Sequence, residues 1–315
     1  VNWGVPLIES EAGLIERLRD LFHTSFENGV EVGIGDDGAV IAASDKKLVA
    51  TVDMAVEEIH FKREWSTPLQ IGAKLTTANL ADVFAMGATP KYLLVAAAIT
   101  EVNNSQIVTD LANGIRSVAD KFKVSVIGGD LSKAEKMSIS ITALGELTGK
   151  AITRDGAKVG DLVYLSALPG LSAAGLAILT RGLNRPKYVV EAHLNPKLVA
   201  PNNLIKVATA MCDISDGLVT DAGNIARASD VNIELSKELL QKSGDFKDFS
   251  ELATELGEDV FDWILTGGED HFFLATVSAD KASDDLGLLV GKVEAGSGVV
   301  NLDGKAITKA GYQHF

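Results

Sequence analysis

The chain has 315 residues and a formal net charge of −14, with 46% hydrophobic and 23% charged residues. This length is enough for two ordinary domains, and the composition is that of a globular protein with an apolar core. The negative charge argues against nucleic acid as a partner, because nucleic-acid binding depends on basic patches. No stretch approaches the roughly 20 consecutive apolar residues that a membrane-spanning helix needs.

The cysteine content indicates the kind of cellular compartment in which the protein occurs. Cys212 is the single cysteine, so neither an intrachain disulfide nor a cysteine-based metal cluster can form. The first residues lack the basic flank and the long apolar run of a secretory signal. We therefore expect a cytoplasmic protein, in a reducing compartment and not bound to a membrane.

The first half of the chain alternates predicted strands and helices. The clearest helix covers 104–122, where apolar residues recur on one stripe. The strand predicted at 47–56 places Thr51 and Asp53 on one face and Val52 on the other. In chain order, we predict a helix over 14–22, strands over 39–44 and 47–56, a helix over 69–87, a strand over 91–100, a helix over 104–122, and strands over 124–130 and 137–147.

The second half is again mixed, after a polar, glycine-rich break near 148–160. We place the domain boundary in this break, giving an N-terminal domain over 1–148 and a C-terminal domain over 149–315. In chain order, we predict a strand over 162–166, a helix over 171–181, helical pieces over 187–210, a helix after DISDGL (213–218), a strand over 231–235, a helix over 247–256, strands over 263–268 and 271–277, and a hairpin over 299–307.

Five aspartates of the first half lie beside glycines, at predicted strand ends or in an apolar helix. Strand ends of a mixed α/β domain converge at one edge, so we expect these carboxylates to meet there. Oxygen ligands without histidine or cysteine suit Mg²⁺, although each acid alone has an alternative as a turn residue or on a solvated face. They are Asp36 and Asp37 in the glycine turn GIGDDGAV (33–40), Asp53 in the strand over 47–56, Asp82 in the helix over 69–87, and Asp130 after two glycines.

The stretch DISDGL offers two further carboxylates and a hydroxyl at a predicted helix start. A helix N-terminus favours phosphate, so Asp213, Ser215 and Asp216 are candidates for binding metal and phosphate. The alternative is that Asp216 simply N-caps the helix, which leaves Asp213 unexplained.

Four more side chains have open alternatives. Glu269 in GGED (267–270) is either a turn acid or an acceptor for a substrate amine. Arg154 either faces a phosphate or is a solvated loop arginine. His60 could be a core histidine, and Tyr312 is a surface aromatic or a stacking platform. Because the glycine turn lacks the Lys and Ser/Thr of a P-loop, a phosphate-handling enzyme here must use another scaffold.

Eight stretches of the sequence resemble those of the thiamine-monophosphate kinase family. This family belongs to the superfamily of aminoimidazole ribonucleotide synthetase, selenophosphate synthetase and HypE. The resemblance implies a two-domain PurM-like fold, with an N-terminal mixed-sheet α/β domain that forms a homodimer through its sheet, followed by a C-terminal α+β domain. The matching stretches, in order from residue 33 to the C-terminus, are GIGDDGAV, TVDMAVEEIHF, ANLADVFAMGATP, IGGD, TRDGAKVGD, DISDGL, GGED and GYQHF.

The same resemblance implies an activity and a set of site residues. The activity is ATP-dependent phosphorylation of thiamine monophosphate to thiamine diphosphate by direct in-line transfer with several Mg²⁺ ions. Asp130, Asp213 and Asp216 would be catalytic. The implied metal ligands are Asp36, Thr51, Asp53, Asp82, Asp130, Asp213 and Asp216, the implied nucleotide contacts are Gly129, Asp130, Arg154 and Ser215, and the implied substrate contacts are His60, Glu269 and Tyr312. We expect Asp36 to bind metal and Asp37 to support the turn.

One position departs from the family, and two other functions stay open. Val52 stands where the family usually has a second hydroxyl residue, so a backbone carbonyl would have to replace that ligand. The first alternative is another enzyme of the superfamily, acting on a ribonucleotide or on selenide. Cys212 lies near neither end of the chain, which counts against selenophosphate synthetase and HypE. The second alternative is a non-catalytic protein that binds a nucleotide or a thiamine phosphate.

Overall fold

The computed structural model describes residues 11–23, 29–34, 38–100, 105–309 and 311–312. The chain separates into two compact units, residues 1–83 with 89–148 and residues 84–88 with 149–315. Residues 84–88 group with the second unit because the Ile152 N–H donates to the Met86 carbonyl (3.1 Å). The functional domain limits 1–148 and 149–315 stay a prediction.

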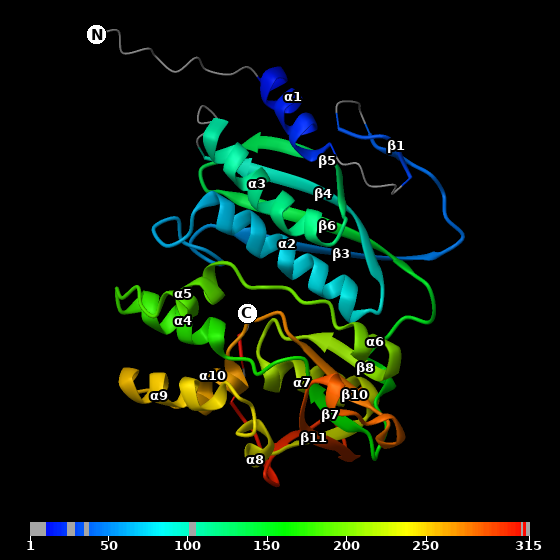
Figure 1. The fold of residues 1–315 in the computed structure, drawn as a ribbon, viewed down its shortest axis with the longest axis vertical. Helices are drawn as coiled ribbons and strands as arrows, with labels where there is room; N and C mark the ends of the chain where they lie inside the picture. Colours follow the sequence, from blue (N-terminus) through cyan, green and yellow to red (C-terminus); the bar gives the residue numbers. More distant parts are fainter. Residues whose placement is uncertain (1–10, 24–28, 35–37, 101–104, 310, 313–315) are drawn as a thin grey trace. The chain divides into compact units, whose positions relative to one another are not determined.

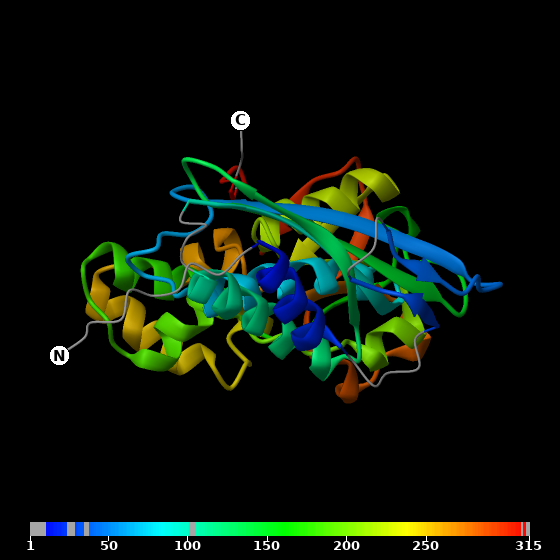
Figure 2. The same cartoon turned by 90° about the horizontal axis from the view of Figure 1, so that it is seen from above.

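The first unit is built on a four-stranded mixed sheet, shown in Figure 1. Its strand order is β3-β6-β4-β5, in which β4 and β5 run parallel and the other pairs antiparallel. The helices of this unit lie on one face of the sheet (Figure 2). The elements are α1 (Glu11–Phe22), β1 (Val30–Val32), β2 (Val40–Ile41), β3 (Lys47–Val56), α2 (Pro68–Ala85), β4 (Thr89–Ile99), α3 (Ser105–Lys121), β5 (Ser125–Lys133) and β6 (Ser138–Leu147).

The two faces of this sheet differ in burial, as the alternation along β3 predicts. Val49 and Ala55 are buried beneath the helices, on the face that also carries Thr51 and Asp53. The other face is left open by the described elements of the first unit and carries several exposed apolar side chains. It exposes Leu48 (55%), Val52 (61%) and Met54 (58%) of β3 and Leu94 (37%) of β4.

The glycines before Asp130 do not end a strand, contrary to the predicted limit at residue 130. Strand β5 continues to Lys133. A Cβ at Gly129 would lie 1.9 Å from the carbonyl oxygen of Val95 on the neighbouring strand. Close approach of β4, and not a turn, therefore requires glycine here.

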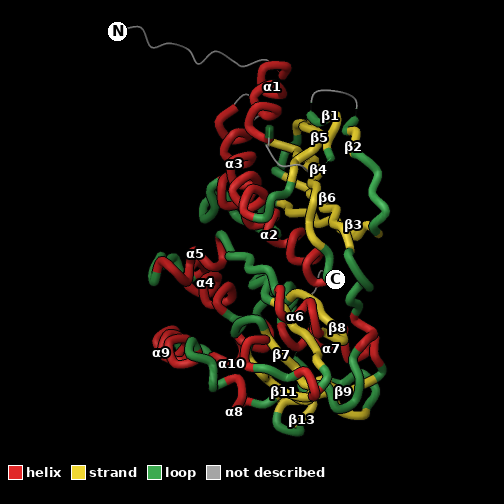
Figure 3. The backbone as a smooth tube through the Cα atoms, turned by 45° about the vertical axis from the view of Figure 1, so that its right-hand side comes forward, coloured by secondary structure: helices red, strands yellow, loops and turns green. Residues whose placement is uncertain are grey.

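The second unit has a seven-stranded sheet in the order β13-β12-β9-β11-β7-β10-β8, with β12 and β9 parallel and the other neighbours antiparallel. Helices α4, α5, α9 and α10 gather to one side of these strands (Figure 3). The elements are η1 (Arg154–Gly156), β7 (Leu162–Leu165), α4 (Leu171–Thr180), α5 (Lys187–Leu194), α6 (Asn202–Val207), β8 (Ala208–Asp213), α7 (Leu218–Ser229), β9 (Val231–Leu235), α8 (Lys237–Leu240), α9 (Phe246–Leu256), α10 (Val260–Thr266), β10 (Phe273–Val277), η2 (Ala279–Lys281), η3 (Asp284–Leu286), β11 (Leu288–Ala295), β12 (Val300–Leu302) and β13 (Lys305–Ala306).

The strand predicted at 263–268 is wrong, because this segment belongs to helix α10. The side chain of Asp259 accepts the N–H of Phe261 (2.9 Å) and caps the helix. Trp263, Ile264 and Leu265 are all buried. A short apolar run that is buried throughout shows no period, so a strand and a buried helix look alike in the sequence.

Three other predictions in the second half and one in the first need correction. The helical pieces predicted over 187–210 stop before residue 208, where β8 begins. Strands β8 and β11 were not predicted, and the strand predicted over 39–44 is limited to β2. The other predicted elements occur within a few residues of their expected bounds. Among the described helices, none is long and apolar enough to cross a membrane.

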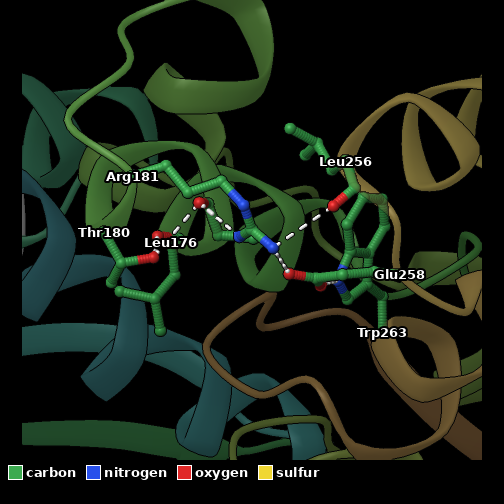
Figure 4. Close-up of polar contacts among 7 residues, drawn as sticks. Leu176, Thr180, Arg181, Leu256, Glu258 and Trp263 are labelled. Carbon is green, nitrogen blue, oxygen red and sulfur yellow. Dashed lines mark hydrogen bonds and ion pairs between the residues drawn. The ribbon is translucent and has the colours of Figure 1, made fainter.

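A polar contact set links α4 to the α9–α10 connection in the second unit (Figure 4). The Glu258 carboxylate accepts one hydrogen bond from the Arg181 guanidinium and another from the Trp263 indole N–H. The same guanidinium donates to the carbonyls of Ala177 (2.9 Å) and Leu256 (3.4 Å). These bonds join the C-terminal end of α4 to the start of α10.

Candidate functional site

Three loop segments of the second unit meet at the end of β8. They are 213–217, from the last residue of β8 to the start of α7; 267–272, between α10 and β10; and 311–312, near the C-terminus. Backbone hydrogen bonds tie the second and third segments to the first. The donors and acceptors are Ile214 N–H to Phe272 O (2.7 Å), His271 N–H to Ile214 O (3.0 Å), Glu269 N–H to Ser215 O (2.8 Å) and Tyr312 N–H to Asp216 O (3.0 Å).

Gly268 makes this close approach possible. A Cβ at this position would lie 2.3 Å from the carbonyl oxygen of Ser215, far inside van der Waals contact. The sequence motifs DISDGL and GGED therefore lie against each other through their backbones. This contact brings Asp213, Ser215, Asp216 and Glu269 into one region.

Asp213 ends β8 and is buried. Its Oδ2 atom lies 3.1 Å from Nδ1 of His271, which is also buried. His271 has a backbone φ of 54°, an uncommon conformation for a residue other than glycine. Such local strain gathers at functional sites, where the surrounding structure holds it.

Asp216 does not cap the following helix, so the capping alternative is wrong. Helix α7 begins at Leu218, with Gly217 at the N-cap and no side-chain cap. Instead, the buried carboxylate of Asp221 accepts the backbone N–H groups of Ser215 (3.2 Å) and Asp216 (3.1 Å). The first turn of α7 thus holds the DISDGL loop from within.

The electrostatics of this region are strongly acidic. The pKa of Asp221 is raised to about 7, chiefly by burial and also by the Asp213 and Asp216 carboxylates, although a backbone hydrogen bond from Asp216 and the Arg154 guanidinium act to lower it. Arg154 therefore lies close enough to Asp221 for its charge to act on that carboxylate. Its backbone carbonyl accepts the Ser229 hydroxyl of α7 (2.8 Å), which fixes η1 beside that helix. The second unit thus brings Arg154 to the same acidic loop.

The predicted substrate contacts are divided between the two units. Glu269 and Tyr312 belong to the second unit, where both bond to the DISDGL backbone. His60 belongs to the first unit, and its Nδ1 accepts the N–H of Val56 (3.0 Å) across the turn that follows β3. This nitrogen of His60 therefore stabilises a turn.

In the first unit, α2 and β3 bring together part of the predicted metal set. The Thr51 hydroxyl donates to Oδ2 of Asp82 (2.7 Å), and Oδ1 of Asn79 accepts the backbone N–H of Asp53 (3.2 Å). Val52 lies on the opposite, open face of β3 and points away from this contact. Asp36 and Asp37 lie outside the described residues.

Asp130 does not join these residues, contrary to the expectation that the carboxylates meet at one edge. Register aligns Asp53 with Ile141, Val95 and Gly129 across the sheet. Asp53 and Asp130 thus lie on the two outer strands, about 14 Å apart at strand spacings of about 4.8 Å. They also lie on opposite faces, because Asp130 follows Gly129 by one residue.

The donor chemistry of these sites fits Mg²⁺ that arrives with a phosphate group. Among the described residues, no group of three or more His, Cys, Asp or Glu side chains could hold a metal ion by itself. Mg²⁺ usually keeps several waters and is bound by one or two carboxylates plus substrate phosphates. The carboxylates of Asp53 and Asp82 in the first unit and of Asp213 and Asp216 in the second are suited to that role.

The sequence-based reasoning missed three buried polar residues at this site: Asp221, Asp270 and His271. Asp270 is buried, and its carboxylate accepts the N–H groups of Gly170 (2.7 Å) and Ser172 (2.9 Å) at the start of α4. A signal was present for two of them, because Asp270 and His271 directly follow Glu269. Nothing local distinguished Asp221 from an ordinary acid in the first turn of a helix.

Comparisons with known protein families match both units. The family model described as AIR synthase related protein, N-terminal domain, matches residues 35–147. The model described as AIR synthase related protein, C-terminal domain, matches residues 158–296. The two matches follow one another along the chain, as the predicted two-domain organisation requires.

Individual relatives narrow the family further. A thiamine-monophosphate kinase of Aquifex aeolicus is 35% identical over 314 residues, covering 97% of this chain and 98% of the relative. A crystal structure of thiamine-monophosphate kinase from Stenotrophomonas maltophilia K279a matches with a TM-score of 0.82 at 29% identity, over 93% of this chain and 96% of that one. A structure of AaThiL complexed with AMPPCP and TMP matches with a TM-score of 0.79 at 33% identity, over 100% of both chains. With its PurM-like fold and full-length similarity, the chain belongs to the thiamine-monophosphate kinase family, within the AIR synthase related proteins.

Proposed function

We propose that this chain transfers the γ-phosphoryl group of ATP directly to the phosphate of thiamine monophosphate, giving thiamine diphosphate and ADP. The observation that carries the proposal is the meeting of DISDGL, GGED and the C-terminal Tyr312 in one region of the second unit. The similar structure of AaThiL complexed with AMPPCP and TMP supports the same pair of substrates.

The proposed roles follow from charge and position. Arg154 and the Ser215 hydroxyl would contact nucleotide phosphates, together with the backbone at Gly129 and the side chain of Asp130. Glu269, Tyr312 and His60 would contact thiamine monophosphate. In-line transfer needs no covalent intermediate, so positioning and charge neutralisation would supply most of the rate enhancement.

We propose three catalytic carboxylates, those of Asp130, Asp213 and Asp216. They would also bind Mg²⁺, together with four further oxygen ligands. Bound Mg²⁺ would neutralise the phosphate charge that these carboxylates otherwise repel. Burial raises the pKa of Asp221 most, and the negative charges of Asp213 and Asp216 raise it as well, so further negative charge is unfavourable in this region. The other proposed metal ligands are Asp36, Thr51, Asp53 and Asp82.

The decisive experiment incubates the purified chain with ATP, Mg²⁺ and thiamine monophosphate and separates the products by chromatography. We expect thiamine diphosphate to form in proportion to ADP, to disappear on chelation with EDTA, and to return when Mg²⁺ is added. Asp216→Asn should abolish turnover, whereas Asp248→Asn, an exposed position on α9, should not change it. Absence of thiamine diphosphate with the unaltered chain would overturn the proposal.

The two alternative functions, a ribonucleotide enzyme and a non-catalytic binding protein, can be distinguished from the kinase by melting temperature and product formation. An enzyme acting on a ribonucleotide would show a larger rise in melting temperature with ribonucleotides than with thiamine monophosphate. A non-catalytic binding protein would bind thiamine monophosphate and form no product. Asp130→Asn separates the kinase from such a binding protein, because only the kinase has a turnover to lose.

We also propose that the chain forms a homodimer through the open face of the first unit's sheet. Four large apolar side chains are exposed there, and contiguous apolar surface of this kind usually marks an interface. A second copy of the chain would cover the same face on its partner, since a two-fold axis pairs identical patches. The four side chains are Leu48, Val52, Met54 and Leu94.

A further inference from the structure

Glu269 is held in an unusual backbone conformation. Its φ is 65°, in the left-handed region that non-glycine residues seldom occupy. The neighbouring residue Asp270 anchors this segment, because its buried carboxylate bonds to the N–H groups of Gly170 (2.7 Å) and Ser172 (2.9 Å). The segment therefore gives the Glu269 side chain a fixed starting direction.

The Glu269 carboxylate is directed to a buried histidine. Oε2 of Glu269 lies 3.6 Å from Nδ1 of His193, in the last turn of α5. The histidine side chain is 8% exposed, whereas that of Glu269 is 36% exposed. The carboxylate thus lies beside a protected polar group, while part of the Glu269 side chain remains exposed.

Ser172 contacts the same nitrogen of the histidine ring. Its hydroxyl oxygen lies 3.0 Å from the same Nδ1 atom, and Ser172 is buried in the first turn of α4. Nδ1 therefore has two oxygen neighbours, the Ser172 hydroxyl at hydrogen-bond distance and the Glu269 carboxylate at 3.6 Å. The positions of Ser172, His193 and Glu269 are coupled, because Asp270 bonds to the backbone of Ser172 as well as following Glu269 in the chain.

Packing alone does not account for this arrangement. Helices α4 and α5 already approach closely at Gly175, where a Cβ would lie 2.5 Å from the carbonyl of Val189. An apolar side chain at position 193 would serve such an interface without burying a polar ring. The buried imidazole instead places a nitrogen beside the single partly exposed carboxylate of the GGED loop.

We infer that His193, fixed by Ser172, is a positioning residue that orients Glu269 to accept a hydrogen bond from the substrate, so that this trio selects an amino-substituted heterocycle over its carbonyl analogue. The inference rests on the proposed function, in which Glu269 contacts thiamine monophosphate. The aminopyrimidine ring of that substrate offers N–H donors. A carbonyl oxygen at the same ring position would face the carboxylate and be rejected.

The test compares thiamine monophosphate with an analogue whose pyrimidine amino group is replaced by a carbonyl oxygen. We expect His193→Leu to raise KM for thiamine monophosphate about tenfold, as the loss of one oriented charge-assisted hydrogen bond predicts, with kcat and KM for ATP little changed. The ratio of kcat/KM between the two substrates should fall by a similar factor. Because Asn places a polar atom near the position of Nδ1, His193→Asn should restore most of the ratio.

Further variants separate orientation from folding. Ser172→Ala should lower the same ratio about threefold, and Glu269→Gln combined with His193→Leu should lose little more than Glu269→Gln alone, because the two residues act as one unit. Thr180→Ala, on the outer end of α4, is the matched control and should change neither KM nor the ratio. Ser172→Ala and His193→Asn keep the test valid if His193→Leu does not fold.

Two results would overturn the inference, and they are distinguishable. If the unaltered chain phosphorylates thiamine monophosphate but the selectivity ratio is the same in His193→Leu, His193→Asn and Ser172→Ala, the histidine only packs α5 and the inference alone fails. If the unaltered chain forms no thiamine diphosphate, the proposed function fails and the inference with it.

Discussion

Asp270 links stability to pH, because its carboxylate is buried among backbone N–H groups. Burial raises the pKa of Asp270 from 3.8 to about 6, although the hydrogen bonds from Gly170 and Ser172 lower it. The folded chain therefore holds this proton more tightly than the unfolded chain does. The resulting stabilisation is fully present below pH 4 and is lost as the pH rises through about 6.

We predict that Asp270→Asn removes this pH dependence. The measured quantity is the free energy of unfolding of the unaltered chain minus that of the variant. This difference should decrease by about 2–3 kcal/mol between pH 4 and pH 7. Urea unfolding at each pH measures the difference. Asp248→Asn should leave the curve of the unaltered chain unchanged, and parallel curves for Asp270→Asn would contradict the prediction.

Gly268 sets the distance between the two motifs of the second unit. We predict that Gly268→Ala destabilises the chain by about 1–3 kcal/mol, because its Cβ would have to displace the Ser215 carbonyl. Turnover should fall as well, since Ser215 and Asp216 move with that backbone. Gly244→Ala, where nothing lies within 4 Å of the added carbon, is the matched control. Equal unfolding midpoints for the two variants would refute the close-contact explanation.

At the scale of elements, Glu258 joins α4 to α10 through Arg181 and Trp263 (Figure 4). We predict that Glu258→Ala lowers the free energy of unfolding by about 1–2 kcal/mol. The partly exposed ion pair contributes at most about 1 kcal/mol, and the Trp263 N–H loses its acceptor. Thermal unfolding measures the loss.

The matched control for this contact is Glu251→Ala on α9, whose carboxylate makes an exposed pair with Lys247 at i,i+4. That variant should change the free energy of unfolding by less than about 0.5 kcal/mol. A comparable loss in both variants would mean that the bridge between α4 and α10 contributes nothing specific.

The sequence predicts whether a segment is a helix or a strand where apolar residues recur with a strong period. It does not do so where every residue of the segment is buried. Helix α3 and strand β3 follow their sequence periods closely. The segment Trp263–Ile264–Leu265 is equally compatible with a strand and with a helix. In the structure it is helical, and Asp259 caps the N-terminus of that helix. Strands β8 and β11 were missed because neither alternates buried and exposed residues regularly, so no period of two marks them in the sequence.

At the scale of the whole molecule, the open sheet face yields a test of assembly. We predict that Val52→Glu shifts the sedimenting species from twice the chain mass of 33.2 kDa to the chain mass itself. A charge on a buried apolar interface is costly, whereas Val52 is exposed within one chain. Leu183→Glu, an exposed apolar position of the second unit, should leave the mass unchanged.

A monomeric unaltered chain would rule out the proposed homodimer. Turnover should be measured alongside the mass, because Asp130 lies on the same open face as Val52. The two measurements together show whether activity depends on the dimer. If activity is lost together with the dimer, the face is needed for function as well as for assembly. If activity survives in the monomer, the nucleotide site does not depend on the second copy.

The sequence by itself determined the fold class, the family and the set of candidate side chains. Motifs such as DISDGL and GGED carry that information because their residue types and spacing are local properties of the chain. The sequence also identified Glu269 and Asp213 as candidate site residues. It gave no indication that buried residues packed beside them would support the site.

Only the tertiary structure decided which candidates lie together and what supports them. It joined Asp213, Ser215, Asp216 and Glu269 through backbone hydrogen bonds, while Asp53 and Asp130 came to lie on opposite edges and faces of one sheet. The reason is physical: strand order and register are set by partners distant in the chain, and a shift of one residue reverses the face of every side chain. The buried supports of the site depend in the same way on contacts that no local pattern encodes, and they are Ser172, His193, Asp221, Asp270 and His271.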